Sequence, residues 1–223
     1  MAGSESLCVR TRATLNNALE DGGLLVSRAG RVFLCPVADE FSIVVALNVV
    51  RCRHDWYETF PALGVRNGAI EALLAKAMDS NRRDNPPASL VSKPLCYLLP
   101  ERSYRTWRVT SDAHIGHTVI ELSKAIFNFG LPIMREYCSV NALLSAFLEA
   151  EKAASAGRAN DAMNTAYLPV MMPLLLYRAH QVREAREYIE RQIEIHEHGT
   201  DVERHWLPPL HRIRDIISEA PIE

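Results

Sequence analysis

The sequence predicts an α+β protein, in which an N-terminal antiparallel sheet with a packed helix is followed by a C-terminal helical region. Apolar residues alternate with a period of two over most of residues 24–60, which is typical of strands. From residue 111 onward they recur at steps of three and four, which is typical of helices. We therefore expect a first part over residues 1–110 and a second over 111–223, packed together as one domain.

The composition is that of a soluble globular protein, with 48% hydrophobic and 23% charged residues in a chain of 223. The net charge of -2 argues against a generic nucleic-acid binder. The start shows no secretory signal, and no apolar run approaches the ~20 residues that span a bilayer. We expect a cytoplasmic protein with no membrane segment. The five cysteines are widely spaced without a Cys-x-x-Cys pair, so we expect reduced thiols, no disulfide and no metal or other cofactor.

A short helix over 11–20 opens the first part, and two strands over 24–27 and 31–37 follow around a glycine turn. The strongest strand covers 41–51 and is apolar on both faces, which predicts a central place in its sheet. The next strand covers 54–60. Short connections between these runs favour an antiparallel meander.

Asn67 is placed to cap a helix over 67–78, which we expect to lie across the sheet. A polar loop over 79–89 follows, and then two strands over 95–99 and 103–109.

The second part should contain successive helices. Ser111 and Ser139 are placed as N-caps, and Gly130 with Pro132 should end the first of these helices. Later helices are predicted over 139–157, 167–179 and 182–196, with a last one after the capping-box pattern Thr200-Asp-Val-Glu203.

Several short motifs resemble a set of small bacterial proteins that includes immunity proteins of polymorphic toxins. The motifs are Phe60-Pro-Ala-Leu-Gly-Val-Arg-Asn-Gly-Ala-Ile-Glu71, Cys96-Tyr-Leu-Leu-Pro-Glu101, Trp107 and Asn128-Phe-Gly-Leu-Pro-Ile133. Cys96 stands where that set has glycine. The resemblance covers roughly residues 20 to 195 and implies that a strand carrying Gly-Val-Arg leads into a helix. It brings no catalytic residue, and the function it implies is neutralisation of a toxin.

A second likeness concerns residues 167–195, where the segment Tyr177-Arg-Ala-His-Gln181 precedes Glu184-Ala-Arg-Glu-Tyr188. This stretch looks like one tetratricopeptide-type helix pair. A single copy predicts a local helical hairpin, because an array needs about three repeats.

Two histidine groups are candidate metal ligands, but neither has the His-Glu-x-x-His pattern or a clear third ligand. They are His114 with His117, and His196 with His198 and His205. We therefore favour surface or capping histidines. Neither a nucleophile elbow nor a phosphate loop occurs, so an enzyme is a minority alternative.

A nucleic-acid-associated protein is the other alternative. Basic and aromatic residues interleave at Arg102, Tyr104, Arg105, Trp107 and Arg108, which is a pattern that can stack on bases. On a strand, however, these residues divide into one solvated face and one core face. With the negative net charge, this makes nucleic acid the less favoured partner.

The candidate partner-binding surface is an acidic stripe on the helix over 182–196. Its residues are Glu187, Glu190, Glu194 and Glu197, continued by Asp201. Steps of three and four place these glutamates on one face, opposite Val182, Ala185, Ile189 and Ile193. A solvated helix face is the simpler interpretation. The functional one is a patch that docks a basic protein partner, so we expect a stoichiometric binder, and most specifically an immunity protein for a cognate toxin.

Overall fold

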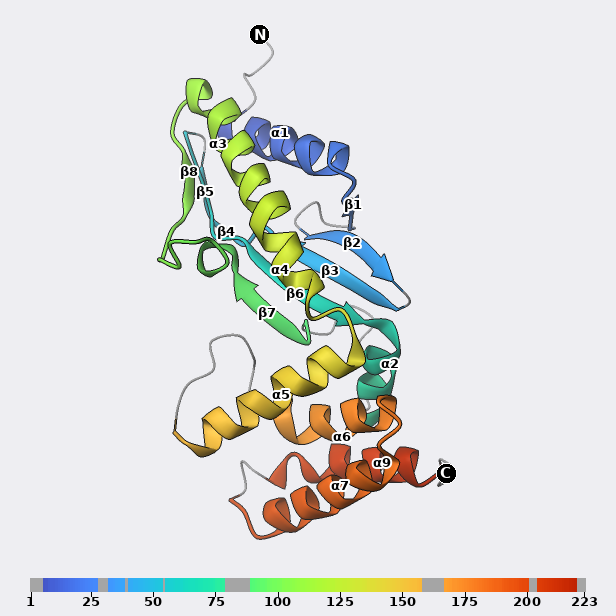
Figure 1. The fold of residues 1–223 in the computed structure, drawn as a ribbon. Helices are drawn as coiled ribbons and strands as arrows, with labels where there is room; N and C mark the ends of the chain where they lie inside the picture. The colour runs from blue at the N-terminus through green and yellow to red at the C-terminus, as the bar shows by residue number, and fades with distance from the viewer. Residues whose placement is uncertain are drawn as a thin grey trace. The chain divides into compact units, whose positions relative to one another are not determined.

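The computed structural model describes residues 6–27, 32–38, 40–53, 55–78, 89–157, 167–200 and 204–219. The chain forms two compact units that interleave in sequence (Figure 1). One comprises Met1–Val65 and Ser92–Cys138, the other Arg66–Val91 and Ser139–Glu223. The predicted α+β class is confirmed, with the antiparallel sheets in the N-terminal half and most helices in the C-terminal half. The division predicted from the sequence, at residue 110, stays a prediction.

The larger sheet of the first unit has five strands in the order β1-β2-β3-β6-β7. These strands are β1 (Leu25–Val26), β2 (Val32–Ala38), β3 (Phe41–Ala46), β6 (Ala62–Asn67) and β7 (Val91–Pro94). β2 pairs antiparallel with both β1 and β3, and Phe33 lies opposite Val45. Because β3 lies between β2 and β6, the central place predicted for it is confirmed.

The smaller sheet has three antiparallel strands in the order β4-β5-β8. They are β4 (Val49–Arg53), β5 (Trp56–Thr59) and β8 (Trp107–Val109). Tyr57, Thr59 and Trp107 point to one face and are almost fully buried. Since strand side chains alternate, Trp56, Glu58 and Arg108 share the opposite face.

The prediction of one strand over 41–51 is wrong. The run divides at Leu47 and Asn48 into β3 of one sheet and β4 of the other. The carbonyl oxygens of Leu47 and Asn48 accept hydrogen bonds outside the regular strand pairing. The Thr59 hydroxyl donates to the oxygen of Leu47, and the Phe60 N–H donates to the oxygen of Asn48 at 3.0 Å. Val50 is consequently 60% exposed on an edge strand and not buried in a central one.

The predictions of two strands over 95–99 and 103–109 are also wrong, the second in its bounds, because only Trp107–Val109 is a strand there. Residues 95–99 do not form a strand, because Leu95–Tyr97 is a 3₁₀ turn, η1, and the strand β7 precedes it. The chain also turns from β5 into β6, a strand absent from the periodicity analysis but implied by the resemblance to the bacterial set.

Helices α1 (Leu7–Asp21) and α3 (Asp112–Ala125) pack against each other on the buried side of the smaller sheet (Figure 1). α1 begins earlier than predicted, with Ser6 as its N-cap. α3 does not end at Gly130, as predicted, but continues through a π-helical turn, η2 (Ile126–Gly130), into α4 (Leu131–Arg135). A side chain at Gly130 would approach Leu63 to 2.7 Å, so this glycine serves packing and not termination.

The prediction that the chain has no disulfide is wrong. Cys8 of α1 and Cys52 of β4 form a disulfide with their Cα atoms 5.4 Å apart, while Cys35, Cys96 and Cys138 are free. The two partners are separated by 44 residues. Only the packing of α1 on the smaller sheet brings them together, so their spacing along the chain does not predict the bond.

The described helices of the second unit are α2 (Gly68–Ala77), α5 (Val140–Ser155), α6 (Leu168–Arg178), α7 (Val182–Glu197) and α9 (Leu207–Ser218). α6 contacts the other four and is buried on nearly all sides. α2 packs on α6 and α9, whereas the sequence analysis placed it across the sheet. α6 and α7 pack together across a short connection, as the predicted helix pair requires.

Candidate functional site

α7 is anchored by one face and exposed on the other. Its buried side chains are Ala185, Tyr188, Ile189, Ile193 and His196, and Val182 is partly buried. These residues recur at helical spacing and pack α7 on α6 and α9. The inward face predicted from the sequence is confirmed, so the other side of α7 faces solvent.

The acidic face of α7 consists of Glu187, Glu190, Glu194 and Glu197, all of which are exposed. Glu187 lies 3.8 Å from Arg183, a pair whose side chains are both more than 70% exposed. No ion pair involves the other three glutamates within the described residues. Asp201, the predicted continuation of this face, lies outside the described residues, as do most of the loop 79–89 and of the capping box after Thr200.

The other two arginines of α7, Arg186 and Arg191, contact groups outside the acidic face. Nη2 of Arg186 donates to the carbonyl oxygens of Ile217 and Ser218, at 3.2 and 3.3 Å, and so binds the C-terminal end of α9. The guanidinium of Arg191 lies 5.1 Å from the centre of the Tyr188 ring. Both arginines therefore stabilise packing, and they leave the acidic face largely uncompensated.

The acidic face does not serve the stability of α7. Like charges three and four residues apart on a helix cost a few tenths of a kcal/mol per pair. Glu194 and Glu197 also lie in the C-terminal turns, where the partial negative charge of the helix disfavours carboxylates.

Tyr188 links the buried side of α7 to α5. Its hydroxyl donates to the Glu151 carboxylate at 2.8 Å. Burial, and then this hydrogen bond, raise the pKa of Tyr188 well above its ordinary value. The tyrosine is therefore a neutral donor that fixes α7 against α5, a role that the sequence does not predict.

A second surface is the open face of the smaller sheet, which carries Arg51, Arg53, Trp56, Glu58, Thr106 and Arg108. The guanidinium carbons of Arg51 and Arg108 lie 5.0 and 4.6 Å from the Trp56 ring centre. Glu58 accepts from the Thr106 hydroxyl at 2.8 Å and lies 3.4 Å from Arg108. Arg51, Arg53 and Trp56 are absent from the sequence-predicted site residues, because a single strand over 41–51 does not bring the two arginines beside Trp56. The change from valines to arginines after Val50 was the available signal.

Within the basic and aromatic segment 102–108, the predicted alternation of a core face and a solvated face holds only in β8, while Arg105, predicted on the core face, is exposed. Trp107 is buried, and Arg105 lies over its ring at 5.1 Å and pairs with Glu121 of α3. Tyr104 points outward, is 69% exposed, and stacks on Phe60 with ring centres 5.3 Å apart.

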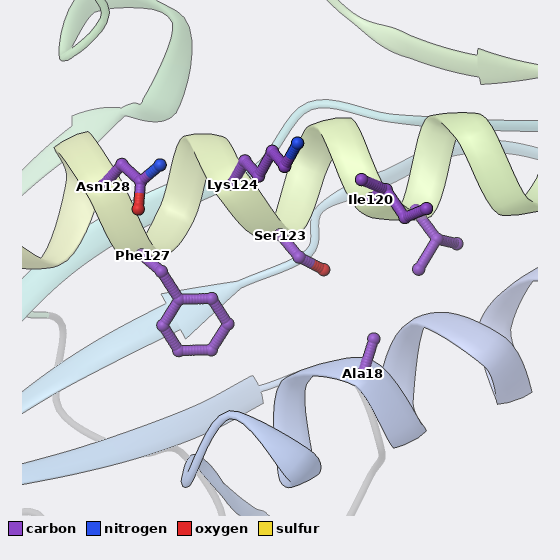
Figure 2. A pocket seen from close by; sticks show the side chains of 7 residues that line it. Ala18, Ile120, Ser123, Lys124, Phe127 and Asn128 are labelled. Carbon is purple, nitrogen blue, oxygen red and sulfur yellow. The ribbon is translucent and has the colours of Figure 1, made fainter.

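A third place where a ligand can be considered is a hollow of about 390 Å³ between α1 and α3. Figure 2 shows the side chains that line it. It is lined by Ala18, Val119, Ile120, Ser123, Lys124, Phe127 and Asn128. Ser123 points its hydroxyl toward the gap, whereas Lys124 and Asn128 point away from α1. The hydroxyl of Ser123 is buried and has no hydrogen-bond partner in the described part of the chain. The hollow offers apolar contacts and one hydroxyl group, which do not indicate a particular class of ligand.

The predicted histidine groups do not assemble into a metal site. His114 and His117 are exposed on α3, while His196 is buried in α7. In the described ranges no group of three or more His, Cys, Asp and Glu side chains is arranged to hold a metal ion.

No family model, curated protein or solved structure matches this chain. The likeness to toxin-immunity proteins therefore remains a prediction from short motifs. Among the described residues, none of the helices is both long enough and apolar enough to cross a membrane.

Proposed function

We propose that this chain is a stoichiometric protein-binding protein that neutralises a bacterial toxin domain in the cytoplasm. The surface proposed to meet the toxin is the acidic face of α7, and the toxin is expected to be basic there. This function follows the motif resemblance, and nothing in the described residues indicates a catalytic mechanism.

One observation supports the choice of surface. Glu190, Glu194 and Glu197 are exposed on a well-anchored helix without an ion-pair partner among the described residues, in positions that lower helix stability. A helix that stays in place when its exposed charges change can present them to a partner without reorganisation. Ile195, 53% exposed on the same helix, adds an apolar contact.

Charge complementarity acts mainly on the rate of association. Exposed charges at an interface steer the encounter, whereas affinity comes from a few buried anchors. The acidic face should therefore control how fast the toxin is captured and how strongly salt slows that capture.

The test is co-expression with a toxin domain encoded beside this gene, followed by binding kinetics at two salt concentrations. The variant reverses three charges, Glu187→Lys, Glu190→Lys and Glu194→Lys. We expect a folded protein, since exposed substitutions usually change stability by less than about 0.5 kcal/mol each. We also expect slower association, a smaller effect of salt on the rate, and weaker protection of the cells.

The matched control reverses three exposed glutamates of the first unit, Glu20→Lys, Glu101→Lys and Glu136→Lys. It changes the net charge equally and should keep the wild-type kinetics. Equally slow association in both variants would mean that the effect comes from the net charge of the protein and not from the acidic face of α7. Unchanged capture and protection in the α7 variant would remove this face from the interface, and absence of any complex would refute the proposed function.

A further inference from the structure

We infer that the open face of the β4-β5-β8 sheet binds single-stranded nucleic acid, with its arginines on the phosphates and Tyr104 stacked on a base. This inference does not rest on the proposed toxin neutralisation, which uses α7 in the other unit. It rests on the arrangement of Arg51, Arg53 and Arg108 around Trp56, and on the exposed ring of Tyr104.

The arginines of this face are preorganised to bind an anion. Register places Arg51 opposite Glu58 and Glu58 opposite Arg108, so the three side chains form one row across the sheet. Arg53 lies opposite Trp56 in the next row. Two guanidinium groups stack on Trp56, which limits their freedom while their outer N–H groups stay in solvent. A preorganised guanidinium loses less entropy when it binds a phosphate.

The local charge differs from that of the chain as a whole. Arg51, Arg53 and Arg108 face a single carboxylate, Glu58, which is only 8% exposed and already accepts hydrogen bonds from Thr106 and Arg108. Asp55, in the hairpin turn between β4 and β5, is the other acidic residue of this sheet. The face therefore keeps a positive excess although the net charge of the chain is -2.

The aromatic side chains decide in favour of a nucleic acid over an acidic polypeptide. Arg51 and Arg108 already lie over the Trp56 ring. Tyr104 stacks on Phe60 but remains 69% exposed, so it can also stack on a base. Phe60 is four residues beyond Trp56, a span of roughly 13 Å along an extended chain. The exposed Tyr104 ring lies beside the arginine row, displaced from it along the strands, so it can stack on a base while the arginines bind neighbouring phosphates. Duplex bases are stacked on each other and cannot use Tyr104.

The experiment measures fluorescence anisotropy of labelled oligothymidylate and oligouridylate, each of about 12 nucleotides, with the full chain at several salt concentrations. Both strands should bind, with an affinity that falls as salt rises. Comparing the DNA oligonucleotide with the RNA oligonucleotide shows which of the two nucleic acids this face binds more tightly. A duplex of equal length should bind more weakly than either.

Two variants separate the roles of charge and stacking. Arg51→Gln with Arg53→Gln should lower affinity about ten-fold or more and reduce the slope of log K against log salt by about 1.4, or ~0.7 per lost phosphate contact. Tyr104→Ala should lower affinity about five-fold or more without changing that slope. The control, Arg135→Gln with Arg183→Gln, removes two exposed arginines from α4 and α7 and should bind as the wild type does.

Three results would overturn the inference. One is the absence of binding to either strand at low salt. Another is a loss of affinity in the control variant as large as that in the Arg51→Gln, Arg53→Gln variant, which would mean that binding depends only on the net charge of the protein. The last is displacement of the oligonucleotide by polyglutamate at equal charge concentration, which would make an acidic polypeptide the occupant. Thermal melts of each variant will show that a loss of binding is not a loss of fold.

Discussion

Glu58 is almost buried on a face of the smaller sheet that otherwise carries exposed arginines. A hydrogen bond from Thr106 is the main cause that lowers the pKa of this carboxyl group. Burial opposes the shift, and Arg108 and Arg51 reinforce it. The folded chain therefore holds Glu58 in its charged form more firmly than the unfolded chain does.

Replacing Glu58 with glutamine should accordingly lower stability at neutral pH. A group with a lowered folded pKa stabilises the protein above its unfolded pKa, and this contribution is lost as pH falls through the folded value. The difference in free energy of unfolding between wild type and Glu58→Gln should thus shrink once pH drops below about 4.3. Denaturant melts from about pH 7 to about pH 3 measure it. A constant difference over this range would contradict the ionic role of Glu58, and exposed Glu101→Gln is the control.

Within the elements, α1 is joined to the smaller sheet both by packing and by a covalent bond. Leu7, Cys8, Tyr57 and Val109 form a buried cluster, and Cys8 of this cluster is bonded to Cys52 of β4. A cross-link that closes a loop of 44 residues restricts the unfolded chain.

Reduction should therefore lower the free energy of unfolding by ~2–4 kcal/mol. Thermal melts with and without a reductant measure this, and the variant Cys8→Ser with Cys52→Ser should no longer respond to the reductant. Thiol titration of the denatured, unreduced protein should find three free thiols, those of Cys35, Cys96 and Cys138. Five titratable thiols would show that the bond is absent.

The division of residues 41–51 between two sheets can be tested by one substitution at two positions. Val45 is fully buried in the central strand β3, so Val45→Asp places an unpaired charge in the core and should cost about 4 kcal/mol or more. Val50 is 60% exposed on the edge strand β4, so Val50→Asp should cost less than about 1 kcal/mol. Equal costs would show that Val50 is as buried as Val45 and would contradict its place on an exposed edge strand. Solubility and urea melts of both variants provide the comparison.

At the scale of the whole molecule, stability should come from apolar cores and from one disulfide. With 223 residues and 48% hydrophobic composition, the chain can bury enough surface to fold without a metal ion. We expect thermal melts with and without a chelator to overlay. A drop in the midpoint of several degrees, reversed by one added divalent metal, would show that a metal contributes to the fold.

Local sequence patterns correctly predicted the features that neighbouring residues determine. Helical spacing located α5, α6 and α7 and both faces of α7, because each turn of a helix is closed by residues three and four positions away. Asn67 and Ser139 were identified as N-caps, and their side chains accept hydrogen bonds from Ile70 and Ala142. Ser111 takes the same position on α3, but its side chain makes no such bond.

Tertiary structure alone decided which strands pair and which distant side chains meet. The period of two marks Phe41 to Val50 as strand, but a strand's partner is chosen by contacts far along the chain, and these divide the run between two sheets. The same long-range packing brings Cys8 to Cys52 and places Arg51 and Arg108 on either side of Glu58. The acidic face of α7 was therefore visible in the sequence, whereas the arginine face of the smaller sheet was not, because it is assembled from three strands.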